Sequence, residues 1–362
     1  MKLADLVVAF ERIAPNALAE TWDNVGLLTG DREQGVSTVL LTIDLTRQVL
    51  AEALSLGADV VYSYHPPIFK PVKNLHDGSV VFEAIRRNVA IYSPHTALDV
   101  ANGGTNDNLA DALGLVGRQP LRRLEPSERD LKLIVFVPGA SFDVVSSALF
   151  AAGAGQIGQY SHCSFRSEGD GTFLGGAGTT PTVGARGRLE VVKEVKLETI
   201  VPIAKLESVL AALRVAHPYE EPAFDLVRLH AAPAAMGMGR IGNIPSRTLA
   251  NCAAALKRHA GVTHALVSGD SGRELTRVAV CAGSGGDLLP DAIRQGAELF
   301  VSGELSHHAA LSAQAAGVAV VCLLHSNSER RTLESVALRL SEALPEVSFV
   351  QSRRDLDPFV IG

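Results

Sequence analysis

Short apolar runs rich in β-branched residues alternate with amphipathic segments in the first third of the chain, and this rhythm constrains the fold most. Strands are predicted at 38–43, 59–63 and 89–93. Helices are predicted between and after them, at 46–56, 79–88 and 106–113. Two of the helices are followed by the terminating glycines Gly57 and Gly114. A β-α-β order of this kind predicts a largely parallel sheet covered by helices, which is the α/β class.

The last third of the chain repeats part of this pattern. Residues 37–63 align with 276–302 at a constant offset of 239 and without gaps. Strand, turn, helix, glycine and strand follow in the same order in both segments, and 88–95 similarly resembles 317–325. We therefore predict two pseudo-duplicated α/β halves that form one body.

A different pattern separates the halves. Residues 117–130 are charged and contain two prolines, which predicts a linker. The next hundred residues favour a β-α-β-β-α-β order, typical of a ferredoxin-like α+β insert. The expected organisation is an N-terminal half at 1–116, the linker, an insert at 131–230 and a C-terminal half at 236–362.

Composition excludes several classes of protein. The formal net charge of −6 and the aromatic content of 5% argue against a nucleic-acid-binding surface. The four cysteines form no Cys-x-x-Cys pair, which excludes a zinc ribbon, and each is expected to be a small buried apolar residue. The first fifteen residues predict an amphipathic helix and not a signal peptide, and no apolar run is long enough to span a membrane. We expect a soluble cytoplasmic protein.

Histidines and carboxylates gather where the predicted strands end. In parallel α/β sheets, ligands collect at the carboxyl ends of strands. The four clusters are Tyr64-His65, His95 with Asp99, Glu304 with His307 and His308, and His325 with Glu329. Imidazole and carboxylate are the ligands that Zn²⁺, Mn²⁺, Fe²⁺ and Ni²⁺ prefer, so the clusters predict a metal site.

Each cluster has a simpler interpretation. His65, which precedes two prolines, could only end a strand, and Asp99 could be a turn residue. Ser326 and Glu329 fit an S-x-x-E capping box at the start of a predicted helix, 329–344. The His307-His308 pair could be solvated at a helix start. Four such clusters at strand ends together favour the metal site.

The same residues form a recognisable set of motifs. In chain order they are Glu20-x-Trp22-Asp23-Asn24-x-Gly26-Leu27, Ser63-Tyr64-His65-Pro66, His95-Thr96-x-x-Asp99, Ser302-Gly303-Glu304-x-x-His307-His308 and His325-x-x-x-Glu329-Arg330. This set resembles the Nif-three-like family of dinuclear-metal-centre hexameric proteins, also called GTP cyclohydrolase I type two homologues. The insert, with its motif His217-Pro218-Tyr219-Glu220-Glu221-Pro222, is similar to the PII/ferredoxin-like module of the longer members.

The resemblance implies up to two divalent metal ions per chain. It assigns His65, Asp99 and Glu329 to one ion and His325 with Glu329 to the second, so that Glu329 bridges the two. Tyr64 occupies a position where the family has a histidine. Because neutral tyrosine is a poor ligand, we expect one firm site and one weak site.

The sequence is compatible with two interpretations of the function. The first is a metal-dependent hydrolase of a small nucleotide-like or phosphorylated substrate, with proton transfer or substrate contacts from His95, Glu304, His307 or His308. The alternative is a non-catalytic, metal-binding regulatory or chaperone-like ring. The resemblance implies a toroidal homohexamer in either case. The Trp22-Asp23-Asn24 segment is expected to close over the site or to cap the next element.

Overall fold

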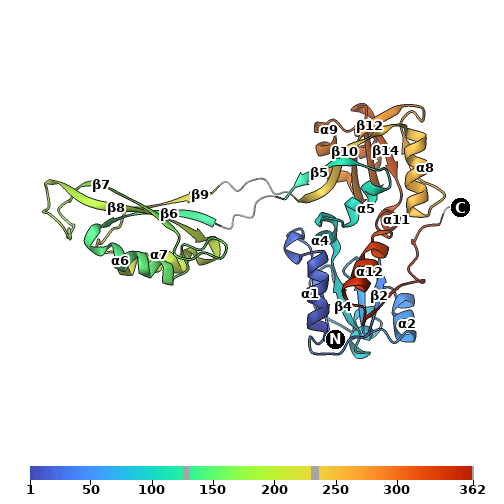
Figure 1. The fold of residues 1–362 in the computed structure, drawn as a ribbon, viewed down its shortest axis with the longest axis horizontal. Coiled ribbons are helices and arrows are strands. Elements are labelled where there is room, and N and C mark those ends of the chain that lie inside the picture. The colour runs from blue at the N-terminus through green and yellow to red at the C-terminus, as the bar shows by residue number, and fades with distance from the viewer. Residues whose placement is uncertain (125–129, 230–235, 361–362) are drawn as a thin grey trace. The chain divides into compact units, whose positions relative to one another are not determined.

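The computed structural model describes residues 1–124, 130–229 and 236–360 and has a mixed α/β architecture (Figure 1). The chain divides into two compact units. The body is formed by Met1–Leu124 with Ala234–Gly362, and the insert unit is Glu125–Pro233. Short 3-10 turns join several elements, namely η1 (Asn16–Leu18), η2 (Gly139–Ser141), η3 (Ile203–Lys205) and η4 (Gly286–Leu288).

The first sheet of the body has the strand order β1-β4-β3-β2-β15. Its strands are β1 (Gly26–Thr29), β2 (Thr38–Thr42), β3 (Val60–Ser63), β4 (Ala90–Ser93) and β15 (Ser348–Gln351). All neighbours pair in parallel except β1 with β4. The last strand of the chain therefore completes the sheet that the first strands began (Figure 1).

Helices cover both faces of this sheet. Val39 and Leu41 of β2 share a core with α1 (Leu3–Ile13) and α12 (Thr332–Ala343). Leu40, between them, points to the opposite core, which α2 (Arg47–Ser55) and α3 (Val80–Arg86) close. A strand buried on both faces requires a continuous apolar run, which explains the run at 38–43.

The second sheet of the body has the strand order β11-β14-β13-β12-β10-β5. Its strands are β5 (Val116–Arg123), β10 (Gly237–Thr248), β11 (Leu266–Ser268), β12 (Glu274–Ser284), β13 (Leu299–Glu304) and β14 (Ala319–Cys322). One face packs on α5 (Thr105–Asp111) and α8 (Leu249–Ala260), and the other on α9 (Leu289–Arg294) and α10 (His307–Ala315).

The duplication seen in the sequence is preserved in the strand register. Val39 of β2 pairs with Val60 of β3, and Val278 of β12 pairs with Leu299 of β13, which are the positions 239 residues later. The order β1-β4-β3-β2 corresponds to β11-β14-β13-β12, with an antiparallel edge strand in each case. The predicted α/β class with two related halves is confirmed.

Two local predictions need correction, and one helix was not predicted. Residues 117–123 of the expected linker belong to β5, which pairs with β10 because Leu121 is buried in the core of the second sheet. The helix expected over 329–344 is two helices, α11 (His325–Glu329) and α12. An additional helix, α4 (His95–Val100), follows β4.

The insert unit has the predicted β-α-β-β-α-β order. Its elements are β6 (Asp130–Pro138), α6 (Phe142–Ala151), β7 (Ser164–Leu174), β8 (Leu189–Pro202), α7 (Leu206–Ala216) and β9 (Phe224–Arg228). The sheet order is β7-β8-β6-β9 with antiparallel neighbours throughout. The second strand, β7, lies in a stretch, 154–188, that is rich in glycine and threonine.

Two general expectations can be compared with the structure. Cys252, Cys281 and Cys322 are buried as expected, whereas Cys163 is partly exposed, and all four are free thiols. Across the described ranges, no helix has the length and apolar character needed to cross a membrane.

Candidate metal centre

Two segments that follow strands in different halves of the body bring three ligand-type side chains together. His65 follows β3, His325 begins α11 just after β14, and Glu329 lies one turn further along α11. Their ligand atoms all lie within 4.8 Å of one another. Glu329 is between the two imidazoles, with Oε2 at 3.3 Å from His65 Nε2 and Oε1 at 3.3 Å from His325 Nε2.

The free atoms of this group fit a cation. His65 Nε2 and Glu329 Oε2 are buried and have no hydrogen-bond partner among the described residues, although they are 3.3 Å apart. Buried polar atoms are normally satisfied, and a metal ion would satisfy both at once. Two imidazoles and one carboxylate therefore suit a borderline divalent ion.

Each histidine is oriented by a second carboxylate. His65 Nδ1 lies 3.0 Å from Asp44 Oδ1, and His325 Nδ1 lies 3.0 Å from Glu304 Oε1. A histidine that donates Nδ1–H to a carboxylate keeps the lone pair of Nε2 for a metal, and the carboxylate increases its basicity. Both Nε2 atoms face Glu329, so the carboxylates of Asp44 and Glu304 orient the two histidines toward one common site.

The charges at the site are strongly coupled. Burial raises the pKa of Glu329, but its contacts with His325 and His65 outweigh burial and lower that pKa to about 2. Burial lowers the pKa of His65, but the carboxylates of Asp44 and Glu329 outweigh it and raise that pKa to about 10. Contact with Glu329 likewise raises the pKa of His325 to about 9. The carboxylate charge thus favours positive charge at this point, which an imidazolium or a metal ion supplies.

Asp99 lies apart from this group. Its Oδ1 accepts a hydrogen bond from the hydroxyl of Tyr64, whose oxygen also lies 3.0 Å from Thr105 Oγ1. Burial, together with the negative charge of Glu329, raises the pKa of Asp99 to about 6. Burial also raises the pKa of Tyr64 well above its ordinary value, so the phenol keeps its proton. The role of Asp99 as a metal ligand stays a prediction.

His95 forms a second, adjacent arrangement. Its Nδ1 lies 2.8 Å from Oδ1 of Asp23, whose side chain is fully buried, and its ring centroid is 5.5 Å from that of His65. Asp23 also accepts the backbone N–H of Thr96, so it caps the start of α4. The exposed rings of Trp22 and Phe69 contact His95 edge-on, with centroids 6.2 and 6.4 Å away. Among the described residues, Asp23 thus contacts α4, 73 residues later, and not the next element, β1, which the sequence suggests as the capped one.

The backbone is strained where the histidines enter the site. His95 has φ +27° and Leu324, directly before His325, has φ +70°. Both values lie in a region that residues other than glycine rarely adopt, and such strain is concentrated at functional sites. Gly283 has φ +63°, and a Cβ there would lie 2.5 Å from Glu329 Oε1. Glycine is therefore required at 283 if Glu329 is to reach the histidines.

The remaining candidates have separate places. Glu304 orients His325, whereas His307 and His308 are exposed at the start of α10 with ring centroids 5.5 Å apart. The capping-box interpretation of Glu329 is wrong, because Glu329 ends α11 and its carboxylate contacts the imidazoles of His65 and His325. Sequence reasoning missed Asp44, although its position directly after a predicted strand was a usable signal.

Comparison with known proteins decides the family. The model of Duf34/NIF3 (NGG1p interacting factor 3) matches residues 1–358. The chain belongs to this family. The resemblance proposed from the sequence motifs is thereby confirmed.

Similar proteins cover the whole length of the chain. A relative from Halalkalibacterium halodurans, called GTP cyclohydrolase 1 type 2 homolog, is 38% identical over 373 residues and covers 99% of each chain. A relative of the same name from Mycobacterium tuberculosis is 37% identical over 91% of this chain and 88% of its own. Among solved structures of the family, a Bacillus cereus protein related to NIF3 has a TM-score of 0.67 and 35% identity, covering 100% of this chain and 99% of that one.

Proposed function

We propose that this chain binds a divalent cation between His65, His325 and Glu329 and hydrolyses a small nucleotide-like or phosphorylated substrate there. The observation that carries the proposal is the unsatisfied buried pair, His65 Nε2 and Glu329 Oε2. Leaving a buried polar atom unpaired costs about 1–3 kcal/mol, and more when the atom is charged. A cation bound between the two atoms would compensate this cost.

The donor set limits the chemistry but not the metal. When bound, a divalent ion supplies Lewis-acid activation of water and of a phosphoryl or carbonyl oxygen. Zinc, manganese, iron and nickel all accept two imidazoles and one carboxylate. His65 and His325 would hold the ion through Nε2, with Glu329 between them.

His95 is the residue best placed to move a proton. Its Nδ1 is held by Asp23, which leaves Nε2 to accept or donate a proton beside the centre. The imidazole is 16% exposed, so solvent and substrate can reach it, whereas Asp23 has no exposed side-chain surface. Asp23 therefore holds the ring in one tautomer and orientation, as a positioning residue.

An aromatic pair beside His95 favours a substrate with a planar ring. Trp22 and Phe69 are 59% and 46% exposed, and their ring centroids are 5.8 Å apart. Exposed aromatic faces of this kind stack with bases, each contributing about 1–3 kcal/mol. This pair supports the nucleotide-like class of substrate over simple phosphoesters.

The test is a hydrolysis assay on the metal-loaded full chain. Protein that contains stoichiometric Zn²⁺ or Mn²⁺ should hydrolyse members of a panel of nucleotides, phosphoesters and cyclic amides. Glu329→Gln should lose both metal and turnover, whereas His95→Asn should keep the metal and lose turnover by roughly 10²–10⁴-fold. Full occupancy without turnover on any substrate would instead favour the alternative, a non-catalytic metal-binding regulator. Failure to bind any divalent ion would contradict both.

We also propose that the chain assembles as a homohexameric ring. The proposal rests on the family resemblance, and analytical ultracentrifugation of the full chain tests it. A mass of one or two chains at micromolar concentration would contradict it.

A further inference from the structure

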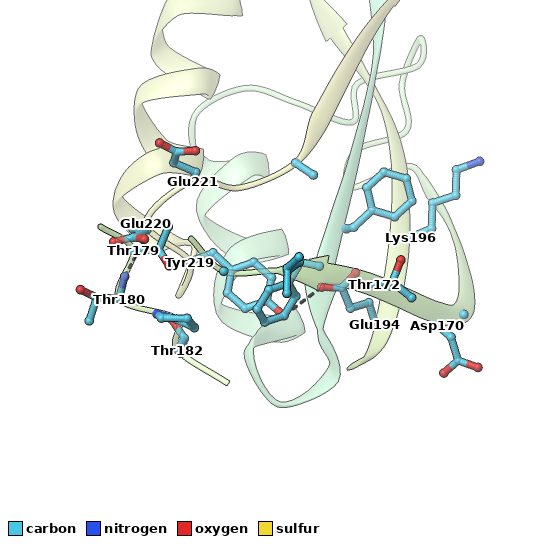
Figure 2. Close-up of a pocket in the computed structure, with 18 of the residues that line it drawn as sticks. Asp170, Thr172, Thr179, Thr180, Thr182, Glu194, Lys196, Tyr219, Glu220 and Glu221 are labelled. Carbon is cyan, nitrogen blue, oxygen red and sulfur yellow. Dashed lines mark hydrogen bonds between the residues drawn. The ribbon is translucent and has the colours of Figure 1, made fainter. Parts of the chain in front are cut away.

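The insert unit contains a cavity of about 600 Å³ (Figure 2). It opens on the face of the sheet opposite α6 and α7. Leu133, Val135 and Leu197 point to the helices, and the alternate residues Phe136 and Lys196 line the cavity. A cavity of this volume has the size of a site for a small organic molecule.

Two glycines of β7 form the floor. Gly169 pairs with Glu194 of β8, so the two residues share one face of the sheet. A Cβ at Gly169 would meet nothing within 4 Å, whereas a Cβ at Gly171 would lie 2.1 Å from Glu194 Oε2. Glycine at these two positions therefore leaves room for a ligand and for the Glu194 carboxylate.

The motif His217–Pro222, which the metal centre does not use, forms one wall. His217 Nε2 lies 3.0 Å from the carbonyl oxygen of Phe136, and its Nδ1 accepts the backbone N–H of Tyr219 at 3.1 Å. The hydroxyl of Tyr219 donates to Glu194 Oε1 at 2.9 Å. Buried His217 thus positions Tyr219, and Tyr219 in turn positions Glu194.

The loop after β7 is fastened to the same motif. Glu220 Oε1 accepts the backbone N–H of Thr180 at 2.9 Å, and Thr182 Oγ1 donates to the carbonyl oxygen of Pro218 at 2.7 Å. Figure 2 shows Tyr219 between this loop and Glu194, with Lys196 on the far side. These hydrogen bonds hold the loop and the motif together as one wall of the cavity.

The lining groups select for positive charge. Five lining side chains are carboxylates, namely Glu168, Asp170, Glu194, Glu220 and Glu221. Lys196, the single lysine or arginine among the described residues of the lining, already pairs with Glu198, and Asp170 pairs with Lys193. The rings of Phe173 and Tyr219 lie with centroids 6.5 Å apart. Carboxylates repel phosphorylated ligands, whereas a carboxylate beside aromatic faces attracts an organic cation.

We propose that this cavity binds an organic cation, an ammonium or guanidinium group carried on a ring or a short apolar chain. Glu194 Oε2 is the counter-ion, and the rings of Tyr219 and Phe173 pack against the apolar body of the ligand. The site uses none of the metal ligands, so it is independent of the function proposed above.

Three indole compounds of similar shape test the charge preference. Tryptamine carries an ammonium group, tryptophol is neutral and indole-3-propionate carries a carboxylate. Calorimetry on the full chain should show tryptamine binding most tightly. Equal affinity for all three, preference for the carboxylate, or no binding of tryptamine would overturn the proposal.

Two pairs of variants locate the binding. Glu194→Gln keeps an acceptor for Tyr219 but removes the charge, and should weaken tryptamine roughly 10–100-fold while leaving tryptophol unchanged. Glu207→Gln, exposed on α7, is the matched control. Gly169→Leu should fill the cavity and abolish binding of both, whereas Gly139→Leu, which also meets nothing within 4 Å and lies outside the cavity, should not. Wild-type affinity in Glu194→Gln or Gly169→Leu would place the binding elsewhere and reject the site.

Discussion

The two halves of the body place the same pair of residue types at equivalent positions, yet the two acids have different roles. His95 and Asp99 lie in α4 directly after β4, and His325 and Glu329 lie in α11 after the equivalent strand β14. In both pairs the acid follows the histidine by four residues, which places the two on one side of a helix. Of these two acids, Glu329 is the one that belongs to the group of ligand atoms with His65 and His325.

The residue next to each acid differs between the two halves. Tyr64, at the end of β3, donates its hydroxyl to Asp99. At the equivalent position, 239 residues later, the second half has Gly303, which has no side chain to hold Glu329. The two strand ends of the duplicated halves therefore differ beside the acid: Tyr64 holds Asp99 by a hydrogen bond, whereas Gly303 offers Glu329 no such contact.

The largest effect is expected at the buried ion pair that joins the halves. Arg240 of β10 contacts both carboxylate oxygens of Asp107 in α5, at 2.9 and 3.0 Å, and its side chain is 6% exposed. Asp107→Asn leaves this charge unpaired and should lower the free energy of unfolding by about 3–5 kcal/mol, measured by urea denaturation. Asp111→Asn, at an exposed pair with Arg118, is the control and should change stability by less than about 1 kcal/mol. Equal losses in both variants would show that the halves do not depend on this pair.

The same pair predicts a pH dependence. Burial raises the pKa of Asp107, but the Arg240 guanidinium outweighs burial and lowers the pKa below its ordinary value of 3.8. A lowered folded-state pKa contributes stability that is present above the unfolded value and is lost as the pH falls through the folded value. The wild type should therefore lose stability from about pH 4 downward. Asp107→Asn should lack this contribution, and parallel curves for the two proteins would contradict the assignment.

The two acids themselves should differ strongly in metal binding. Glu329→Gln removes the carboxylate between His65 and His325 and should weaken metal affinity by more than the roughly 10–100-fold typical of losing an outer partner. Asp99→Asn should have a smaller effect, because Asp99 lies outside the group within 4.8 Å. Competition with a fluorescent chelator measures both affinities. Losses of equal size would mean that Asp99 is a ligand after all.

The smallest effect is expected at Tyr64. It tests the difference between the two halves of the body most directly. Tyr64→His restores the imidazole that the family resemblance places there and should increase the metal stoichiometry per chain. Tyr64→Phe, which frees Asp99 without adding a ligand, is the matched control and should leave the stoichiometry unchanged. Elemental analysis of protein purified without chelator distinguishes the two. An unchanged metal content in Tyr64→His would remove Tyr64 as the cause of the difference.

Much of the fold could be predicted from the sequence, because its signals are local. The continuous apolar run of β2 indicates burial on both faces, and the offset of 239 residues correctly indicates that β2-β3 and β12-β13 share one register. The β-α-β-β-α-β order of the insert follows from the same kind of pattern. The linker prediction failed at β5, because the pairing of that strand with β10 depends on a segment more than a hundred residues later.

For the site, the sequence by itself determined which residue types stand at the strand ends, including His65, His325 and Glu329. Only the tertiary structure decided that Glu329 faces both imidazoles, that Asp44 and Glu304 orient them and that Tyr64 holds Asp99. In the insert, likewise, the tertiary structure paired Gly169 of β7 with Glu194 and brought the hydroxyl of Tyr219 to the Glu194 carboxylate. Side-chain chemistry is carried by each residue, but contact depends on strand register, helix direction and the neighbour across the site, which residues distant in the sequence supply.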